Sequence, residues 1–228
     1  MANCYFTPHT MTFLRKLAQH NQRDWFEQNK MVYEETVRTP ALHFINDMAD
    51  ELAILSPHFL AQAKKVGGSL MRVHRDVRFG MDKRPYKTNI GIQFRHERGK
   101  DVHAPGFYVH IEPNDCFVGV GIWRPDAPAL GKVRDVIAEQ GNNWLAVINS
   151  KQFKQYYALS GESLSRPPRG YAKDHPLLDD LRRKDFIALS ALDDEQVTSS
   201  RFAKLVLNRF KAADSFMQFL CSALELQY

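Results

Sequence analysis

Cysteine is scarce in this chain, and long apolar runs are missing. The 228 residues include three cysteines, and an odd number without paired spacing excludes a disulfide framework and favours reduced thiols. The first residues form no apolar signal run. No apolar segment approaches the ~20 residues that are needed to cross a bilayer. These absences predict a cytoplasmic protein that does not associate with a membrane.

Motifs that would identify a reaction are absent too. The chain has no Gly-x-Ser-x-Gly sequence to present a serine nucleophile, and neither common glycine-rich phosphate loop occurs. No internal repeat or low-complexity stretch is visible. The sequence therefore leaves open whether the protein is an enzyme, and it identifies no cofactor.

The composition is that of a packed protein. Hydrophobic residues make up 44% of the chain, with 12 Gly and 11 Pro, which is ordinary for a folded chain of this length. Apolar residues recur at helical spacing near both ends, and the middle third alternates with period two. We predict a single α+β domain over residues 1–228, in which N-terminal and C-terminal helices cover a mostly antiparallel sheet.

Alternating runs define the predicted strands. They cover residues 71–79, 89–95, 107–112 and 116–123, with a late edge strand over 186–192. The third and fourth runs are joined by Pro113-Asn114-Asp115, which predicts a hairpin. In the fourth run Gly119 and Gly121 leave a bare patch on one face. Either a ligand or a packed helix can approach the backbone there.

The first predicted strand carries an unusual density of charge. Its polar side consists of Arg72, His74, Asp76 and Arg78, and we expect these residues to share one face of the sheet with Gln93, Tyr108, His110 and Glu112. Residues 72–89 contain six Lys and Arg but two carboxylates, so four positive charges are left over. Such a surplus must be solvated or completed by an anion, because unpaired charge away from water is costly.

The same stretch resembles the signature of a bacterial domain-of-unknown-function family, number 2461. It reads Arg72-x-x-Arg75-Asp76-x-Arg78-Phe79-x-x-x-Lys83-x-Pro85-Tyr86-x-x-Asn89. The segment from Phe13-Leu14 to Trp25-Phe26 and the sequence Tyr108-x-His110-x-Glu112-Pro113 are similar as well, so the resemblance covers nearly the whole chain. It implies a bacterial single-domain protein with a shared motif, and it implies no activity.

The surplus of positive charge predicts a site for an anionic small molecule that carries a phosphate or a carboxylate. Arginine side chains form paired charge-assisted hydrogen bonds with such groups, and lysine acts as a point charge. The predicted ligand-binding residues are Arg72, Arg75, Arg78, Lys83, Tyr86 and Asn89. If the ligand is hydrolysed or a group is transferred, Asp76 is the candidate base, with His110 or Glu112 as its partner.

Other interpretations remain open. The motif can be a structural network in which Asp76 pairs with Arg72 and Arg78, and a protein-interaction module would have no cleft above it. Nucleic-acid binding is a further alternative, less favoured because the formal net charge is a modest +5. It would use Arg166, Arg169, Tyr171, Lys173 and the basic run 182–184.

Metal binding has a weak signal in the sequence. His74-x-Asp76 and His110-x-Glu112 each place two metal-ligating side chains on one strand face. Neighbouring arginines would repel a divalent cation, so no metal is predicted.

Overall fold

A computed structural model describes residues 3–78, 81–99 and 104–228. Within these residues an antiparallel sheet has the strand order β1-β2-β3-β4-β6-β5. The strands are β1 Phe59–Leu60, β2 Ile90–His96, β3 Gly106–Ile111, β4 Cys116–Ile122, β5 Ala158–Ser160 and β6 Phe186–Leu192. The predicted hairpin is present, since β3 pairs with β4. The α+β prediction is confirmed.

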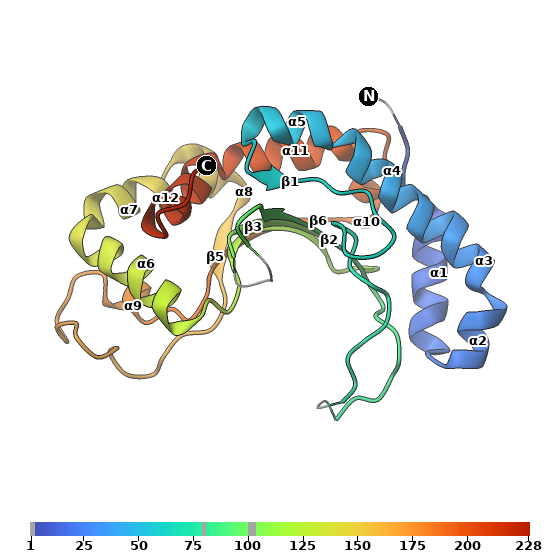
Figure 1. Cartoon of the computed structure of the whole chain (residues 1–228), viewed down its shortest axis with the longest axis horizontal. Helices are drawn as coiled ribbons and strands as arrows, with labels where there is room; N and C mark the ends of the chain where they lie inside the picture. Colours follow the sequence, from blue (N-terminus) through green and yellow to red (C-terminus); the bar gives the residue numbers. More distant parts are fainter. Residues whose placement is uncertain (1–2, 79–80, 100–103) are drawn as a thin grey trace.

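Helices from both ends of the chain cover one face of this sheet (Figure 1). The N-terminal helices are α1 Pro8–Gln19, α2 Arg23–Gln28, α3 Lys30–Tyr33, a π-helical turn Glu34–Arg38, α4 Thr39–Asp47 and α5 Ala49–Leu55. Those that follow β4 are α6 Ala127–Glu139, α7 Gly141–Ile148, α8 Lys151–Tyr156, α9 Leu178–Leu181, α10 Asp194–Val197, α11 Phe202–Ala212 and α12 Asp214–Ala223. None of these helices is both long and apolar enough to cross a membrane.

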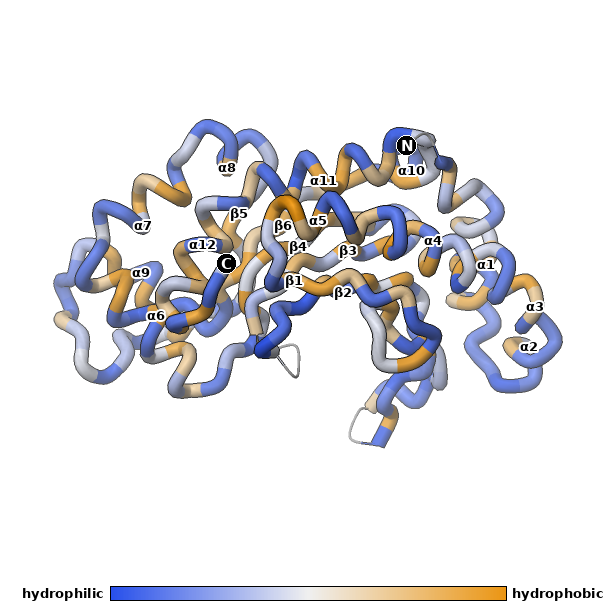
Figure 2. Tube along the Cα trace, turned by 45° about the horizontal axis from the view of Figure 1, so that its top comes forward, coloured by the Kyte–Doolittle hydropathy of each residue, from blue (hydrophilic) through white to orange (hydrophobic). Residues whose placement is uncertain are grey.

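The core lies between the sheet and the covering helices. Phe94 and Phe107 point from β2 and β3 toward α11, where their ring centroids lie 5.8 and 4.5 Å from that of Phe210. All three side chains are fully buried, and burying a side chain of this size contributes ~1.5–3 kcal/mol. Hydrophobic residues follow the strands and the helix faces that meet them (Figure 2). The opposite face of the sheet is open between α6 and α9 at one end and residues 70–78 and 81–89 at the other (Figure 1).

The predicted first strand over residues 71–79 is wrong. The described part of this segment belongs to an irregular hairpin that projects from the sheet, with isolated bridges at Leu70↔Ile92 and His74↔Tyr86. Asp76 accepts a hydrogen bond from the Arg78 backbone N–H at 3.2 Å, and such side-chain bonds compete with strand pairing. Phe79, Gly80 and the segment 100–103 lie outside the described residues.

The predicted polar face therefore divides in two. Arg72, His74, Asp76 and Arg78 lie on the hairpin rather than on the sheet. The expected edge strand also differs in position. Its bounds are those of β6, but β6 lies between β4 and β5, because the short β5 pairs along its outer side.

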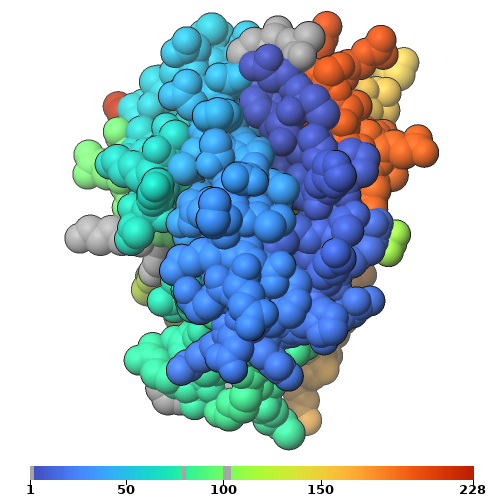
Figure 3. All heavy atoms as spheres, turned by 90° about the vertical axis from the view of Figure 1, so that its right-hand side faces the viewer, coloured from blue at the N-terminus to red at the C-terminus, as the bar shows by residue number. Residues whose placement is uncertain are grey.

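The hairpin is anchored to the N-terminal helices at Tyr86. Asn21 donates a hydrogen bond from Nδ2 to the Tyr86 carbonyl and accepts one from the Tyr86 N–H, both at 3.0 Å. The Tyr86 ring stacks on Phe26 with centroids 4.1 Å apart. Figure 3 shows the hairpin below the N-terminal helices at this end of the molecule. The anchor determines where the residues next to Tyr86 lie.

Candidate functional site

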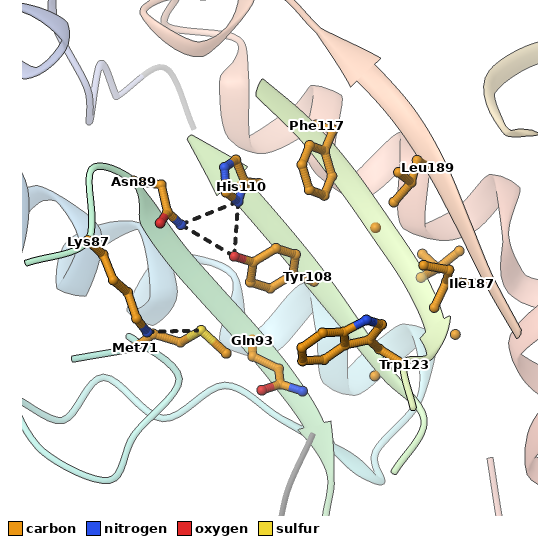
Figure 4. A pocket seen from close by; sticks show the side chains of 14 residues that line it. Met71, Lys87, Asn89, Gln93, Tyr108, His110, Phe117, Trp123, Ile187 and Leu189 are labelled. Atoms are coloured by element: carbon orange, nitrogen blue, oxygen red, sulfur yellow. Dashed lines mark hydrogen bonds between the residues drawn. The ribbon is translucent and has the colours of Figure 1, made fainter. Parts of the chain in front are cut away.

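A cavity of about 480 Å³ lies on the open face of the sheet. Its floor follows the strand register, in which Gln93, Tyr108, Gly119 and Leu189 form one row across four strands. The polar side of the cavity is lined by Lys87, Asn89, Gln93, Tyr108 and His110. The apolar side is lined by Phe117, Trp123, Ile187 and Leu189 (Figure 4).

Both glycines of β4 line the cavity, and Gly119 leaves the sheet surface hollow at this point. A Cβ atom built on Gly119 would have Leu189 Cδ2 as its nearest neighbour, at 3.4 Å, so there is room above this residue. Gly121 has φ +111°, and a Cβ atom there would lie 2.0 Å from the Phe186 carbonyl oxygen. The bare patch predicted from the sequence is part of the cavity. No described helix packs on it, so of the two alternatives the packed helix was wrong.

A chain of polar contacts runs along β3 at the edge of the cavity. Tyr108 Oη lies 3.1 Å from His110 Nδ1, and His110 Nε2 lies 3.4 Å from Glu112 Oε2. Asn89 Nδ2 approaches His110 Nδ1 at 3.3 Å, as Figure 4 shows. The Thr88 hydroxyl donates a hydrogen bond to the other carboxylate oxygen of Glu112. Asn89, Tyr108 and Thr88 therefore hold the His110–Glu112 pair from three sides.

Burial controls the protonation of this chain. It lowers the pKa of His110, although the nearby Glu112 carboxylate opposes the shift, so the imidazole is neutral at neutral pH. Burial raises the pKa of Tyr108 to about 12, so its hydroxyl keeps the proton. A neutral imidazole has one donor and one acceptor nitrogen. It can donate from Nε2 to Glu112 and accept from Tyr108 at Nδ1, and this arrangement can relay a proton.

Lys87 brings a positive charge to the polar side of the cavity. Burial, together with the nearby charge of Arg72, lowers the pKa of this half-buried lysine. Its Nζ atom lies 4.0 Å from Met71 Sδ. Neither Lys87 nor Arg72 forms an ion pair with any carboxylate of residues 3–78, 81–99 or 104–228. Part of the charge surplus counted in the sequence therefore lies beside the cavity.

The predicted ligand-binding residues are distributed between two places. Asn89 lines the cavity, whereas Tyr86 is buried against Phe26. Arg72 lies on the hairpin, and its charge helps to lower the pKa of Lys87. The other three make contacts within the hairpin. Arg75 pairs with Asp82, Arg78 pairs with Asp76 at 2.7 Å, and the Lys83 ammonium donates to the Val77 carbonyl at 2.9 Å.

The predicted catalytic residues are divided in the same way. His110 lines the cavity and is in contact with Glu112. Asp76 is on the hairpin, where hydrogen bonds from Arg78 hold the pKa of its carboxyl well below the usual range. A carboxylate of such low basicity is a poor proton acceptor at neutral pH.

Some of the residues considered for nucleic-acid binding have carboxylate partners. Arg182, Arg183 and Lys184 form ion pairs with Asp179, Asp180 and Glu162 at 3.6, 3.2 and 3.1 Å. The Tyr171 hydroxyl donates a hydrogen bond to Asp135 at 2.6 Å. These pairs reduce the charge and the exposed ring surface that a phosphate backbone and its bases would meet.

Sequence reasoning missed Lys87, which falls on an unspecified position of the motif. A signal for it existed. In an extended chain every second side chain lies on the same side, so residues 87, 89, 91 and 93 share one side. Three of these residues, Lys87, Asn89 and Gln93, line the cavity. Ile187 and Leu189 of the apolar side were missed because they come from β6, far away in the sequence.

The fold and the cavity define an α+β protein with a site of small-molecule size whose lining is polar on one side and apolar on the other. A family model described as "Conserved hypothetical protein (DUF2461)" matches residues 9–219, and the chain belongs to this family. This confirms the resemblance noted in the sequence. The curated proteins and the solved structures that were searched contain no match to the chain.

Proposed function

We propose that the cavity binds a small molecule that combines an anionic group with an apolar body. The observation that carries this proposal is Lys87, a half-buried cation without an ion-pair partner among the described residues, at the edge of a largely apolar cavity. Removing a charge from water without a partner is costly. A ligand carboxylate or phosphate would offset that cost.

The other polar groups around the cavity suit an anion. The Asn89 side-chain amide and the Tyr108 hydroxyl line the same space as Lys87 (Figure 4), and either can turn from His110 to donate a hydrogen bond to a bound anion. Gln93 accepts from Arg95 Nε through its amide oxygen at 3.0 Å, so its amide nitrogen is turned toward the cavity as a donor. Hydrogen bonds that involve a charged group contribute ~1.5–3 kcal/mol each. Two or three of them hold a small anion.

The apolar side gives the ligand its second property. Phe117, Trp123, Ile187 and Leu189 face the cavity across from Lys87 (Figure 4). The volume of about 480 Å³ falls in the range of pockets that hold drug-sized ligands. Simple inorganic phosphate would leave this surface exposed to water. An aromatic or aliphatic carboxylate, or a phosphate ester with an apolar group, would cover it.

Calorimetry and thermal shift with matched ligand pairs test the proposal. Each carboxylate, such as an aryl or medium-chain acid, is compared with its own neutral amide. We expect the acid to bind at least tenfold more tightly than the amide, because tenfold corresponds to ~1.4 kcal/mol, about the contribution of one charge-assisted bond. Lys87→Met, which keeps the length of the side chain and removes its charge, should abolish the preference.

Lys83→Met is the matched control on the same hairpin. The Lys83 ammonium donates to the Val77 carbonyl and does not line the cavity, so this variant should bind the acids like the natural chain. If Lys83→Met loses the preference and Lys87→Met keeps it, the anion binds the hairpin and not the cavity. If no acid binds more tightly than its amide to the natural chain, the proposal is wrong.

A further inference from the structure

Three side chains with metal-ligating atoms converge at the end of β3. Atoms of His110, Glu112 and Asp115 that can bind a metal all lie within 4.8 Å of one another. The turn between β3 and β4 brings the two carboxylates together, since the Asp115 N–H donates to the Glu112 carbonyl at 2.9 Å. One imidazole and two carboxylates are a donor set that suits divalent first-row transition metals.

The charge balance of this cluster also favours a cation. Within the described chain neither Glu112 nor Asp115 forms an ion pair with a lysine or an arginine, and the only ion-pair contact of Glu112 is with the largely buried His110. Arg84 interacts with Glu112 through its charge at longer range. The sequence argument against a metal assumed repelling arginines beside His110. The charges that act on His110 come instead from Glu112 and Asp115.

We propose that His110, Glu112 and Asp115 bind a divalent transition-metal ion at the polar end of the cavity. Two of the three side chains are already held in place by neighbours, as metal ligands usually are. Thr88 holds the second carboxylate oxygen of Glu112. His110 stacks on Phe117 at 4.6 Å, and its Nδ1 contacts Tyr108 and Asn89. The Nε2 atom is the ring nitrogen that faces Glu112.

This site goes beyond the ligand proposed for the cavity, because its donors bind the ion with or without an organic molecule. Metal binding at Nε2 leaves the proton of a neutral imidazole on Nδ1. That N–H then donates to Tyr108 Oη, so the Tyr108 hydroxyl proton is directed toward the cavity. The ion would thereby orient a hydrogen-bond donor of the cavity as well as add positive charge at its polar end.

Titration of the full chain with Mn²⁺ alone tests the site, after treatment with a chelator. Mn²⁺ prefers oxygen and imidazole donors to thiols, so the exposed Cys4 does not compete. Calorimetry and the loss of the free-ion electron paramagnetic resonance signal should both report one ion per chain. Glu112→Gln and Asp115→Asn should each weaken binding by at least about tenfold, the lower limit seen for changes around metal sites.

Glu97→Gln is the control, because Glu97 forms a comparable pair with His58 at 2.8 Å without a third converging ligand among the described residues. It should bind Mn²⁺ like the natural chain. Asp115 is exposed, so Asp115→Asn keeps the fold and decides the question if Glu112→Gln is unstable. The proposal is overturned if the natural chain binds no Mn²⁺, or if Asp115→Asn binds it as tightly.

Discussion

At the scale of single residues, Gly119 and Gly121 have different reasons to be glycine. Gly119→Ala places a methyl group at ordinary van der Waals distance from its neighbours, the nearest being Leu189 at 3.4 Å. It should leave the free energy of unfolding unchanged or raise it by ~0.5–1 kcal/mol, because glycine weakens a strand interior. Gly121→Ala combines a positive φ with a contact of 2.0 Å to backbone. We expect it to lose ~1–3 kcal/mol or more.

Urea denaturation of the two variants measures this difference. The same Gly119→Ala protein should bind ligands with a smaller apolar body, because the new methyl group occupies part of the cavity floor. Equal losses of stability in both variants would contradict the positions assigned to these residues, since of the two only Gly121 would bring an added Cβ atom against the backbone of β6.

His110 gives the molecule a pH dependence of known sign. Burial lowers its pKa in the folded protein below the ordinary value of 6.5, so the unfolded chain binds a proton more readily. The free energy of unfolding should therefore be constant with respect to this group above pH ~6.5, and should fall as the pH drops below that value. In His110→Gln this contribution should disappear. Denaturation curves for both proteins between pH ~5 and ~8 measure the difference.

The carboxylates with a lowered pKa affect the free energy of unfolding at lower pH than His110 does. Asp76 and Asp82 are held ionised by Arg78 and by Arg84 with Arg75, and their pKa values lie far below the usual range. These two carboxylates change the free energy of unfolding only at pH values below the ordinary pKa of aspartate, about 3.9. That range lies outside the window in which His110 titrates. A slope that is the same in His110→Gln and the natural chain would show that His110 is not the group responsible.

At the scale of elements, the stability of the hairpin depends on its anchor more than on its charges. Asn21→Ala removes both hydrogen bonds to the Tyr86 backbone. The buried amide and carbonyl lose their partner, so we expect a loss of about 2–6 kcal/mol, from ~1–3 kcal/mol for each of the two unsatisfied groups. Affinity for the cavity ligand should fall too, because Lys87 follows Tyr86 directly.

Arg84→Ala is the control for the anchor. The Arg84–Asp82 pair is largely exposed, and exposed pairs contribute little to stability. The unfolding midpoint of this variant should match that of the natural chain. A larger shift for Arg84→Ala than for Asn21→Ala would show that the ion pairs, and not the anchor, hold the hairpin.

The sequence predicted the elements where a single pattern determines them. Strands β2 and β3 were found because apolar and polar residues alternate in them, and β4 because Val118, Val120 and Ile122 alternate with glycines; each lies next to a turn signal. Residues 71–79 alternate in the same way, but Asp76 and Asp82 form hydrogen bonds with the backbone N–H groups of Arg78 and Arg84. Such local bonds cannot be distinguished from strand pairing by alternation alone. The motif was therefore assigned to the sheet although it lies beside it.

At the scale of the whole molecule, the cavity exists because the helices share one face of the sheet. The sequence predicted that helices cover the sheet, and it identified the bare glycine patch. It could not determine which face α4, α5, α11 and α12 cover, because that depends on packing between distant segments such as Phe44 and Phe202. Asn89 was predicted as a hydrogen-bonding group of the motif and His110 as a proton-transfer partner of Asp76. Their common feature is that they line the cavity on the uncovered face.

The distribution of charge over the molecule predicts how binding responds to salt. The formal net charge is +5, and the basic run at 182–184 is paired with carboxylates. A labelled single-stranded oligonucleotide should therefore bind weakly, and its affinity should fall steeply from ~50 to ~200 mM salt, because phosphate contacts release counterions. Affinity for a cavity carboxylate should change much less over the same range. Lys87 is half-buried, and screening acts mainly on exposed charges.

Fluorescence anisotropy and calorimetry at three salt concentrations separate the two behaviours. Oligonucleotide binding that stays tight at ~200 mM salt would favour a nucleic-acid partner over the small-molecule ligand.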